Sequence, residues 1–286
     1  MGALRDRMQT DLKLRDYRPA TQTQYLRCVR ELTKHYRRSP AELDEEQVRS
    51  FLLYLREGRG LCPSTISIYT AALKFFYGIT LRRTEMVFSM GSPKVRPKLP
   101  SVLSGTQVAT LLGAIRSLKQ RTVVTALYAA GLRVSEACKL CVEDIDSQRM
   151  LIHVRDGKGG RDRFAVLSPK LLEMMRVYWR VERPLPPYLF PGQRSGKTLS
   201  PDTVRQTLRR AARRCGITKR VTPHLLRHCF GAHMLELGTD IRVLQALLGH
   251  RSIRTTQLYV QVSKQLIART GSPLDRLGTQ EGKVLG

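Results

Sequence analysis

The 286-residue sequence lacks any long run of apolar residues and is short of acidic side chains. Apolar residues make up 42% of the chain and the mean hydropathy is −0.27, yet no apolar run reaches the roughly 18 residues of a membrane span. The first 18 residues, MGALRDRMQTDLKLRDYR, are charged throughout and have no apolar signal-peptide core. These absences predict a globular protein with a cytoplasmic location and no membrane partner.

The sequence also lacks the usual motifs for nucleotides and metals. It has no Walker motif, no cluster of paired carboxylates and no complete zinc site. Cys138 and Cys141 form a C-x-x-C, but a tetrahedral zinc site needs two further ligands and no second close pair exists. We therefore expect no metal and no cofactor, and we interpret the thiols as buried structural groups in a reducing compartment.

Basic residues are abundant, in contrast to acidic ones. The chain holds 50 Lys and Arg against 23 Asp and Glu, a formal charge of +27. The excess is spread along the chain, with 19 basic against 10 acidic residues in 1–99 and 31 against 13 in 100–286. Such a balance indicates a polyanionic partner, with nucleic acid first and an acidic membrane surface a distant second.

A proline-rich basic segment, MGSPKVRPKLP at 90–100, marks the clearest boundary and suits a stiff, extended linker. Four patterns of helical spacing precede it and predict a small helical bundle. The predicted organisation is an N-terminal helical domain over 1–90, a linker over 91–100 and a second domain over 101–286.

The second domain is predicted to be mainly α-helical with one small β-sheet, an α+β fold. Ser104 and Gln107 resemble a capping box at a helix start. Further helices are expected near 121–130, from Val134, and over 169–180, 201–215, 223–237, 240–248 and 252–260. Two β-rich runs, MLIHV and RFAVL, flank the turn RDGKGGRD and predict a hairpin with Lys158 at its tip.

Six residues in this second domain could together carry chemistry. His224 and Arg227 lie three apart on one helix and so share a face. Taken singly, each candidate has a structural explanation, as a core tyrosine, a structural histidine or a surface arginine. The six candidates are Arg133, Lys158, His224, Arg227, His250 and Tyr259.

In order and spacing these residues resemble the tyrosine recombinase, or phage integrase, family. The matching segments are GLRVSEACKL, DGKGGRDR, PHLLRHCF, LLGH and TTQLYV. The resemblance covers the N-terminal bundle as well as nearly the whole second half. It implies a SAM-like core-binding domain followed by a catalytic domain, and a site-specific recombinase that cleaves and rejoins DNA.

The chemistry of the family explains why these residue types occur together. Attack of the Tyr259 oxygen on a DNA phosphate creates concentrated negative charge, which the guanidinium groups of Arg133 and Arg227 can bind bidentately. By analogy, Lys158 protonates the departing 5′-oxygen, while His224 and His250 add hydrogen bonds. A free phenol with a pKa near 10 is a weak nucleophile, so His224 is expected to help accept the Tyr259 proton.

Two neighbouring residues complete the predicted site. Glu136 resembles the acidic residue that orients the first arginine, although an exposed helix charge is the alternative interpretation. His228 matches the trailing histidine of the H-x-L-R-H motif, where a supporting role is favoured over a chemical one. The 3′-phosphotyrosine conserves the energy of the broken bond, so religation needs no ATP.

Within the family, the sequence is most similar to integron and Xer-type integrases but lacks the segment that integron integrases carry before the second arginine motif. We therefore expect duplex sites, with a homotetramer on two sites exchanging strands through a Holliday junction. Accessory DNA-binding proteins and the target sequence are left open. The tail, 264–286, is predicted to dock on a neighbouring subunit. Five arginines of one helix could hold phosphates or form a solvated basic face: Arg205, Arg209, Arg210, Arg213 and Arg214.

Two other functions remain open on the sequence alone. A type IB topoisomerase shares the phosphotyrosine chemistry but only relaxes supercoils. A non-catalytic DNA-binding relic of an integrase would keep the fold without the reaction. The separate N-terminal bundle counts against the first, and the intact candidate positions count against the second.

Overall fold

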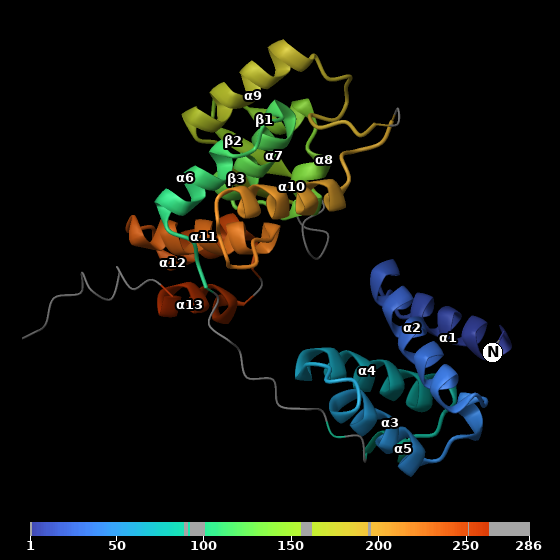
Figure 1. The fold of residues 1–286 in the computed structure, drawn as a ribbon. Coiled ribbons are helices and arrows are strands. Elements are labelled where there is room, and N and C mark those ends of the chain that lie inside the picture. The colour runs from blue at the N-terminus through green and yellow to red at the C-terminus, as the bar shows by residue number, and fades with distance from the viewer. Residues whose placement is uncertain are drawn as a thin grey trace, which may run out of the picture. The chain divides into compact units, whose positions relative to one another are not determined.

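The computed structural model describes residues 2–88, 91, 101–155, 162–193, 196–250 and 252–262. The chain divides into two compact units, Met1–Pro97 and Lys98–Gly286, each with its own core (Figure 1). Both units are mainly helical, and the second contains one three-stranded sheet. The predicted fold class, mainly α with a small sheet, is confirmed.

The first unit is a bundle of helices, several of which begin with a capping box or a proline. A capping box of Asp44 and Gln47 opens one helix, while Pro19 and Pro63 occupy first helical positions. Apolar faces meet in a core that includes Met8 and Leu32. The elements are α1 (Gly2–Leu14), α2 (Pro19–Tyr36), the 3₁₀ turn η1 (Pro40–Glu42), α3 (Glu45–Glu57), α4 (Pro63–Phe75), the π-helical turn η2 (Phe76–Thr80) and α5 (Glu85–Phe88).

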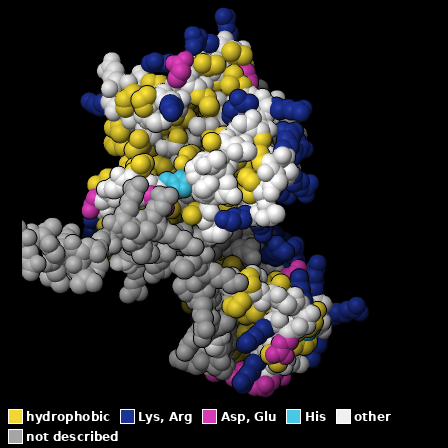
Figure 2. Space-filling model, turned by 60° about the vertical axis from the view of Figure 1, so that its left-hand side comes forward, with side chains coloured by type: hydrophobic (Ala, Val, Ile, Leu, Met, Phe, Trp, Pro, Cys, Tyr) yellow, Lys and Arg dark blue, Asp and Glu magenta, His cyan; other side chains and the backbone are white. Residues whose placement is uncertain are grey.

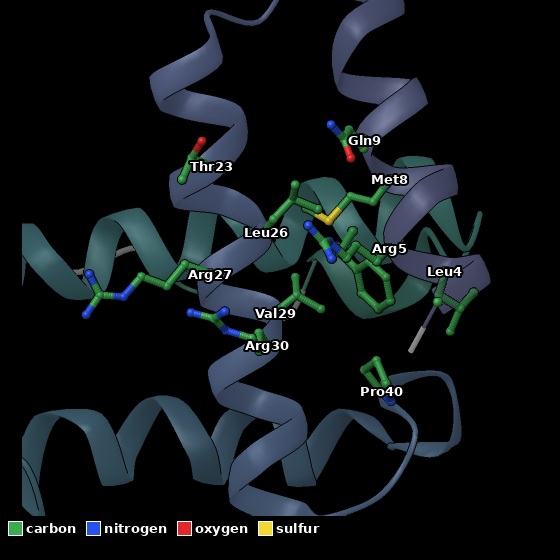
Figure 3. Close-up of a pocket in the computed structure, with 12 residues that line it drawn as sticks. Leu4, Arg5, Met8, Gln9, Thr23, Leu26, Arg27, Val29, Arg30 and Pro40 are labelled. Carbon is green, nitrogen blue, oxygen red and sulfur yellow. The ribbon is translucent and has the colours of Figure 1, made fainter.

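A cavity of about 410 Å³ lies between α1 and α2 in this unit. Figure 3 shows Met8, Leu26 and Val29 among its lining side chains, with Arg27 and Arg30 also on α2. None of the five candidate catalytic residues that the structure describes lines it.

The second unit begins with the predicted capping box, in which Ser104 accepts from the Gln107 amide and the Gln107 side chain accepts from the Ser104 amide. Its elements are α6 (Gly105–Gly113), α7 (Leu118–Ala129), α8 (Val134–Lys139), the 3₁₀ turn η3 (Val142–Asp144), β1 (Ile145–Asp146), β2 (Leu151–Val154), β3 (Arg163–Val166), α9 (Pro169–Glu182), α10 (Pro201–Arg214), α11 (Pro223–Glu236), α12 (Ile241–Leu248) and α13 (Ile253–Val262).

The predicted hairpin is formed by β2 and β3, paired antiparallel with Ile152 opposite Ala165. A third strand, β1, pairs with β2 on its other side. At two residues, β1 is too short to show an alternating pattern in the sequence. The hairpin tip with Lys158, most of the predicted linker, and the tail 264–286 lie outside the described residues.

Two clusters of buried residues organise the second unit. The larger one includes Val123, Leu208 and Leu226, from α7, α10 and α11. A smaller one joins α11, α12 and α13 through Phe230, Leu248 and other apolar side chains. Figure 1 shows these three helices together at the end of the unit opposite α9. This end holds the candidate site.

The cysteines are all free, so no disulfide stabilises the described chain. Cys28, Cys138 and Cys229 are buried as expected, but Cys62 is exposed, and Cys141 and Cys215 are half-buried. The expectation of uniformly buried thiols is therefore wrong for three of them. No helix among the described residues is long and apolar enough to cross a membrane.

Candidate active site

Arg133 is placed by the tight turn between α7 and α8. Gly131 has a φ of +60°, and a Cβ there would lie 2.4 Å from the ring of Phe230. Both the left-handed backbone and the close approach favour glycine. Arg133 follows as the N-cap residue of α8, with about a quarter of its side chain exposed.

Glu136, one turn into α8, binds Arg133 twice. Its carboxylate accepts from Arg133 Nη1 at 2.6 Å and from the Arg133 backbone amide at 2.8 Å. Burial opposes ionisation of Glu136, but hydrogen bonds and charge from Arg163, followed by those of Arg133, outweigh it and lower its pKa to about 2. The alternative of an exposed helix charge is wrong, because the Glu136 side chain is only 6% exposed.

Arg227 lies on α11 and is almost completely buried, at 2% exposure. Its Nη1 donates to the Gly131 carbonyl at 2.6 Å, and its Nη2 donates to the Leu248 carbonyl. Nη1 also lies 3.9 Å from a Glu136 oxygen. Burial, and then the charge of Arg133, lower the pKa of Arg227 to about 10, so it remains cationic at neutral pH.

Three histidines lie near these arginines and are held neutral. The rings of His224 and His228 on α11 are 4.2 Å apart. Burial lowers the pKa of His228 to about 4 and that of His250 to about 3, with neighbouring imidazole or arginine charge acting in the same direction. Desolvation, Arg227 and Arg133 also lower the pKa of His224. Each is therefore neutral near pH 7 and has an unprotonated ring nitrogen that can accept a hydrogen bond.

His250 follows α12, which ends in a left-handed Gly249. Its Nδ1 is 3.1 Å from the hydroxyl of the buried Thr256 on α13, and its backbone carbonyl accepts from the side-chain amide of Gln245. These contacts fix the imidazole relative to the helix that carries Tyr259.

Tyr259 is 1% exposed within the cluster of α11, α12 and α13. Its ring stacks on His250 with centroids 6.1 Å apart, and its centroid is 5.4 Å from that of His228. Burial raises the pKa of the phenol, although Arg227 and Arg133 act in the opposite direction. The hydroxyl is therefore protonated at neutral pH and needs an acceptor before it can act as a nucleophile.

The structure thus brings five of the six sequence candidates to one end of the second unit: Arg133 just before α8, His224 and Arg227 on α11, His250 just after α12, and Tyr259 on α13. Lys158 lies outside the described residues. The catalytic roles of all six stay predictions. Among the described residues, no group of three or more metal-binding side chains occurs.

The remaining histidines have structural contacts. His35 lies among aromatic rings of the first unit, 4.5 Å from that of Tyr54. His153 pairs with Asp162 at 3.0 Å, and His233 lies between the Tyr128 hydroxyl and the Leu103 carbonyl.

The sequence interpretation missed Arg163, the first residue of β3. Two of its guanidinium nitrogens donate to the two oxygens of Glu136, at 3.0 and 2.8 Å. It follows the glycine-rich turn and is one arginine among several there, so only its position in the fold reveals the contact.

The chain is similar to known proteins in both sequence and fold. The model of the phage integrase family matches residues 101–265, and that of the phage integrase N-terminal SAM-like domain matches residues 4–85. The Sinorhizobium fredii protein y4qK, provisionally named an integrase/recombinase, is 43% identical over 278 residues, covering 97% of this chain and 90% of that protein. The tyrosine recombinase XerA of Thermococcus onnurineus is 37% identical over 259 residues, covering 89% of each chain.

A lambda integrase dimer bound to a COC′ core site has a similar fold, with a TM-score of 0.74 at 18% identity over 93% of this chain and 96% of that one. The chain belongs to the phage integrase family. It is a tyrosine-type site-specific recombinase, an enzyme that cuts and rejoins DNA strands through a phosphotyrosine intermediate.

Proposed function

We propose that Tyr259 is the nucleophile of strand cleavage and that Arg133 and Arg227 bind the scissile phosphate. One observation carries the proposal. A buried tyrosine lies against two neutral imidazoles, in the field of two arginines that share one carboxylate. This arrangement supplies a nucleophile, proton acceptors and a positive charge for the transition state in one place.

The reaction balances without an added co-reactant. The Tyr259 oxygen forms a bond to phosphorus while the bond from phosphorus to the 5′-oxygen breaks, leaving a 3′-phosphotyrosine and a 5′-hydroxyl. Lys158 is the proposed donor of the proton that the 5′-oxygen takes up. Attack by a partner strand's 5′-hydroxyl reverses these steps and releases Tyr259.

The Tyr259 phenol needs a proton acceptor before its oxygen can attack. His224 is the proposed acceptor, and its pKa is lowered by desolvation and by the two arginines. His228 lies 4.2 Å from the His224 ring and 5.4 Å from the Tyr259 ring, measured between centroids, so it supports the same step. His250 contributes a hydrogen bond to the phosphate.

Duplex DNA is the proposed partner of both units. The formal charge is +27, and a lambda integrase of the same fold has been crystallised as a dimer on a DNA core site. The five arginines of α10 are all exposed, although Arg205 pairs with Asp202 and Arg214 donates to the Ala114 carbonyl. Figure 2 shows basic side chains gathered along one edge of the larger unit in that view. The five arginines of α10 are proposed to hold DNA phosphates.

The proposed assembly is a homotetramer on two paired sites, with strand exchange through a Holliday junction. We also propose the domain limits 1–90, 91–100 and 101–286. In this assembly the tail 264–286 docks on a neighbour, so its deletion should abolish recombination and spare DNA binding.

The experiment that tests Tyr259 is a denaturing pull-down of the tagged protein from host cells, followed by sequencing of any attached DNA. Wild type is expected to retain sharp DNA ends, and Tyr259→Phe to retain none. Adducts scattered without sequence preference would instead favour topoisomerase activity. Absence of an adduct from both proteins, with DNA binding intact, would favour the non-catalytic alternative.

A further inference from the structure

Three guanidinium groups surround the buried carboxylate of Glu136. Arg133 donates to it at 2.6 Å, Arg163 binds both oxygens, and Arg227 lies 3.9 Å away. The proposed phosphate ligands are Arg133 and Arg227. Arg163 has no assigned role, yet it makes the most extensive contact with the carboxylate.

Arg163 also reaches a second element. Its Nε donates to the Leu247 carbonyl at 2.9 Å, near the end of α12. The last carbonyls of a helix have no partner within the helix and must be satisfied from outside. Arg227 does the same for the next carbonyl, that of Leu248. Two arginines therefore hold consecutive carbonyls just before Gly249 and His250.

The residue after α12 is a glycine, which leaves room for the Arg163 side chain. Gly249 has a φ of +59°, and a Cβ there would lie 2.8 Å from Arg163 Cδ. The arginine stem passes directly against the glycine backbone. Only 9% of the Arg163 side chain is exposed, so bulk water does not replace these hydrogen bonds.

The charges show what this contact does for the neighbouring arginines. Within the described cluster, Arg133, Arg163 and Arg227 carry three positive charges against the single negative charge of Glu136. Arg163 occupies both carboxylate oxygens of Glu136. Glu136 can therefore orient Arg133 without pairing so strongly with Arg133 and Arg227 that neither can bind the phosphate. A net positive charge then remains for an incoming phosphate.

We propose that Arg163 is a positioning residue of this recombinase. It joins Glu136 to the end of α12, and so keeps Arg133, Arg227 and His250 in the arrangement that receives the scissile phosphate. The proposal rests on the proposed roles of Arg133, Arg227 and Tyr259. It predicts that substitution of Arg163 slows cleavage of a charged phosphate more than cleavage of an uncharged one.

The test compares Arg163→Gln and Arg163→Lys with wild type in single-turnover formation of the covalent adduct. The probe is a synthetic duplex with the sequence of the DNA ends that wild type retains in the pull-down. A second duplex carries a methylphosphonate at the scissile position, where a methyl group replaces one oxygen and removes the negative charge. Arg149→Gln is the matched control, because Arg149 pairs with Asp146 at 3.9 Å while 82% exposed.

On the phosphate duplex, Arg163→Gln is expected to slow adduct formation about 10-fold to 100-fold, less than the loss of a direct transition-state donor. Arg163→Lys should also be slow, because lysine keeps the charge but lacks the planar fork that reaches three acceptors. On the methylphosphonate duplex the defect should shrink to about 3-fold or less. Glu136→Gln should add little further loss in the Arg163→Gln background.

Equal rates for wild type and Arg163→Gln on the phosphate duplex would overturn the proposal. So would equal losses on both duplexes, which would indicate a general loss of folding. Arg163→Lys and a thermal melt of each variant guard against a Gln variant that fails to fold. If wild type itself forms no adduct that depends on Tyr259, the proposed function fails first, which separates the two outcomes.

Discussion

Gly231 lies on α11 directly against the ring of Tyr259. A Cβ at this position would lie 2.8 to 2.9 Å from three ring carbons of the tyrosine. Alanine normally stabilises a helix relative to glycine by about 1 kcal/mol, so the helix alone would favour a larger residue. The close approach explains why glycine occupies the position, and it fixes where the Tyr259 ring can lie.

We therefore expect Gly231→Ala to displace Tyr259. Adduct formation should fall more than about 10-fold, and the free energy of unfolding should drop by about 1–3 kcal/mol, typical of overpacking. Single-turnover cleavage and chemical denaturation measure the two effects. The control is Gly113→Ala on α6, where a Cβ would meet nothing within 4 Å. Wild-type cleavage by Gly231→Ala would show that the ring has room to move.

Thr256 holds His250 through one hydrogen bond, of 3.1 Å to Nδ1, and is fully buried. Thr256→Val keeps the side-chain shape but removes the hydroxyl, so the imidazole loses its partner. Adduct formation should fall about 10-fold while DNA affinity is unchanged, which single-turnover rates and a binding titration would resolve. Thr110→Val on α6, where the hydroxyl bonds only to a carbonyl of its own helix at 3.0 Å, is the control. Equal rates for both variants would remove Thr256 from the site.

At the scale of elements, α10 presents exposed arginines on a face away from its buried residues. Arg209→Gln and Arg213→Gln should each weaken binding to all duplex sequences and reduce the slope of log affinity against log salt by about 1. Arg180→Gln on α9, an exposed arginine paired with Glu173 at 3.5 Å, is the control. An unchanged salt slope in the α10 variants would indicate a solvated basic face.

Most helices of the second unit could be predicted because local signals mark them. The Ser104–Gln107 capping box, Thr222 before Pro223, and the glycines after α11 and α12 act within a few residues of each helix end. The strand β1 could not be predicted, since its pairing with β2 depends on the fold and its two residues show no period.

The residues of the candidate site also divide into those that the sequence reveals and those that only the fold reveals. Arg133, Arg227 and Tyr259 were found because their surrounding motifs resemble a known family. Arg163 and Gly231 were not, because their importance lies in contacts across 27 residues to Glu136 and 28 residues to Tyr259. A sequence shows that an arginine or a glycine is present, but only the packed structure shows what it touches.

At the scale of the whole molecule, groups with a depressed pKa gather in the second unit. His228 and His250 have folded pKa values of about 4 and about 3, against 6.5 for a free imidazole. Glu136 has a pKa of about 2, against 4.5. The unfolded chain therefore binds more protons than the folded chain as the pH falls from 6.5. The contribution of these groups to the free energy of unfolding is therefore present in full well above pH 6.5 and is lost progressively as the pH falls below it.

Trp179, the single tryptophan, lies on α9 against the core of the second unit, so its fluorescence reports unfolding of that unit. Each imidazole contributes at most about 1.4 kcal/mol per pH unit, so moving from pH 7 to pH 5 should lower the free energy of unfolding by roughly 2–4 kcal/mol. Urea titrations followed by Trp179 fluorescence at both values measure this change. His250→Gln, which cannot titrate, should show a shallower dependence on pH even if it is less stable at pH 7. Equal unfolding free energies at pH 7 and pH 5 in wild type would mean that the fold does not lower the pKa values of these imidazoles, so burial beside the arginines would not be what keeps them neutral.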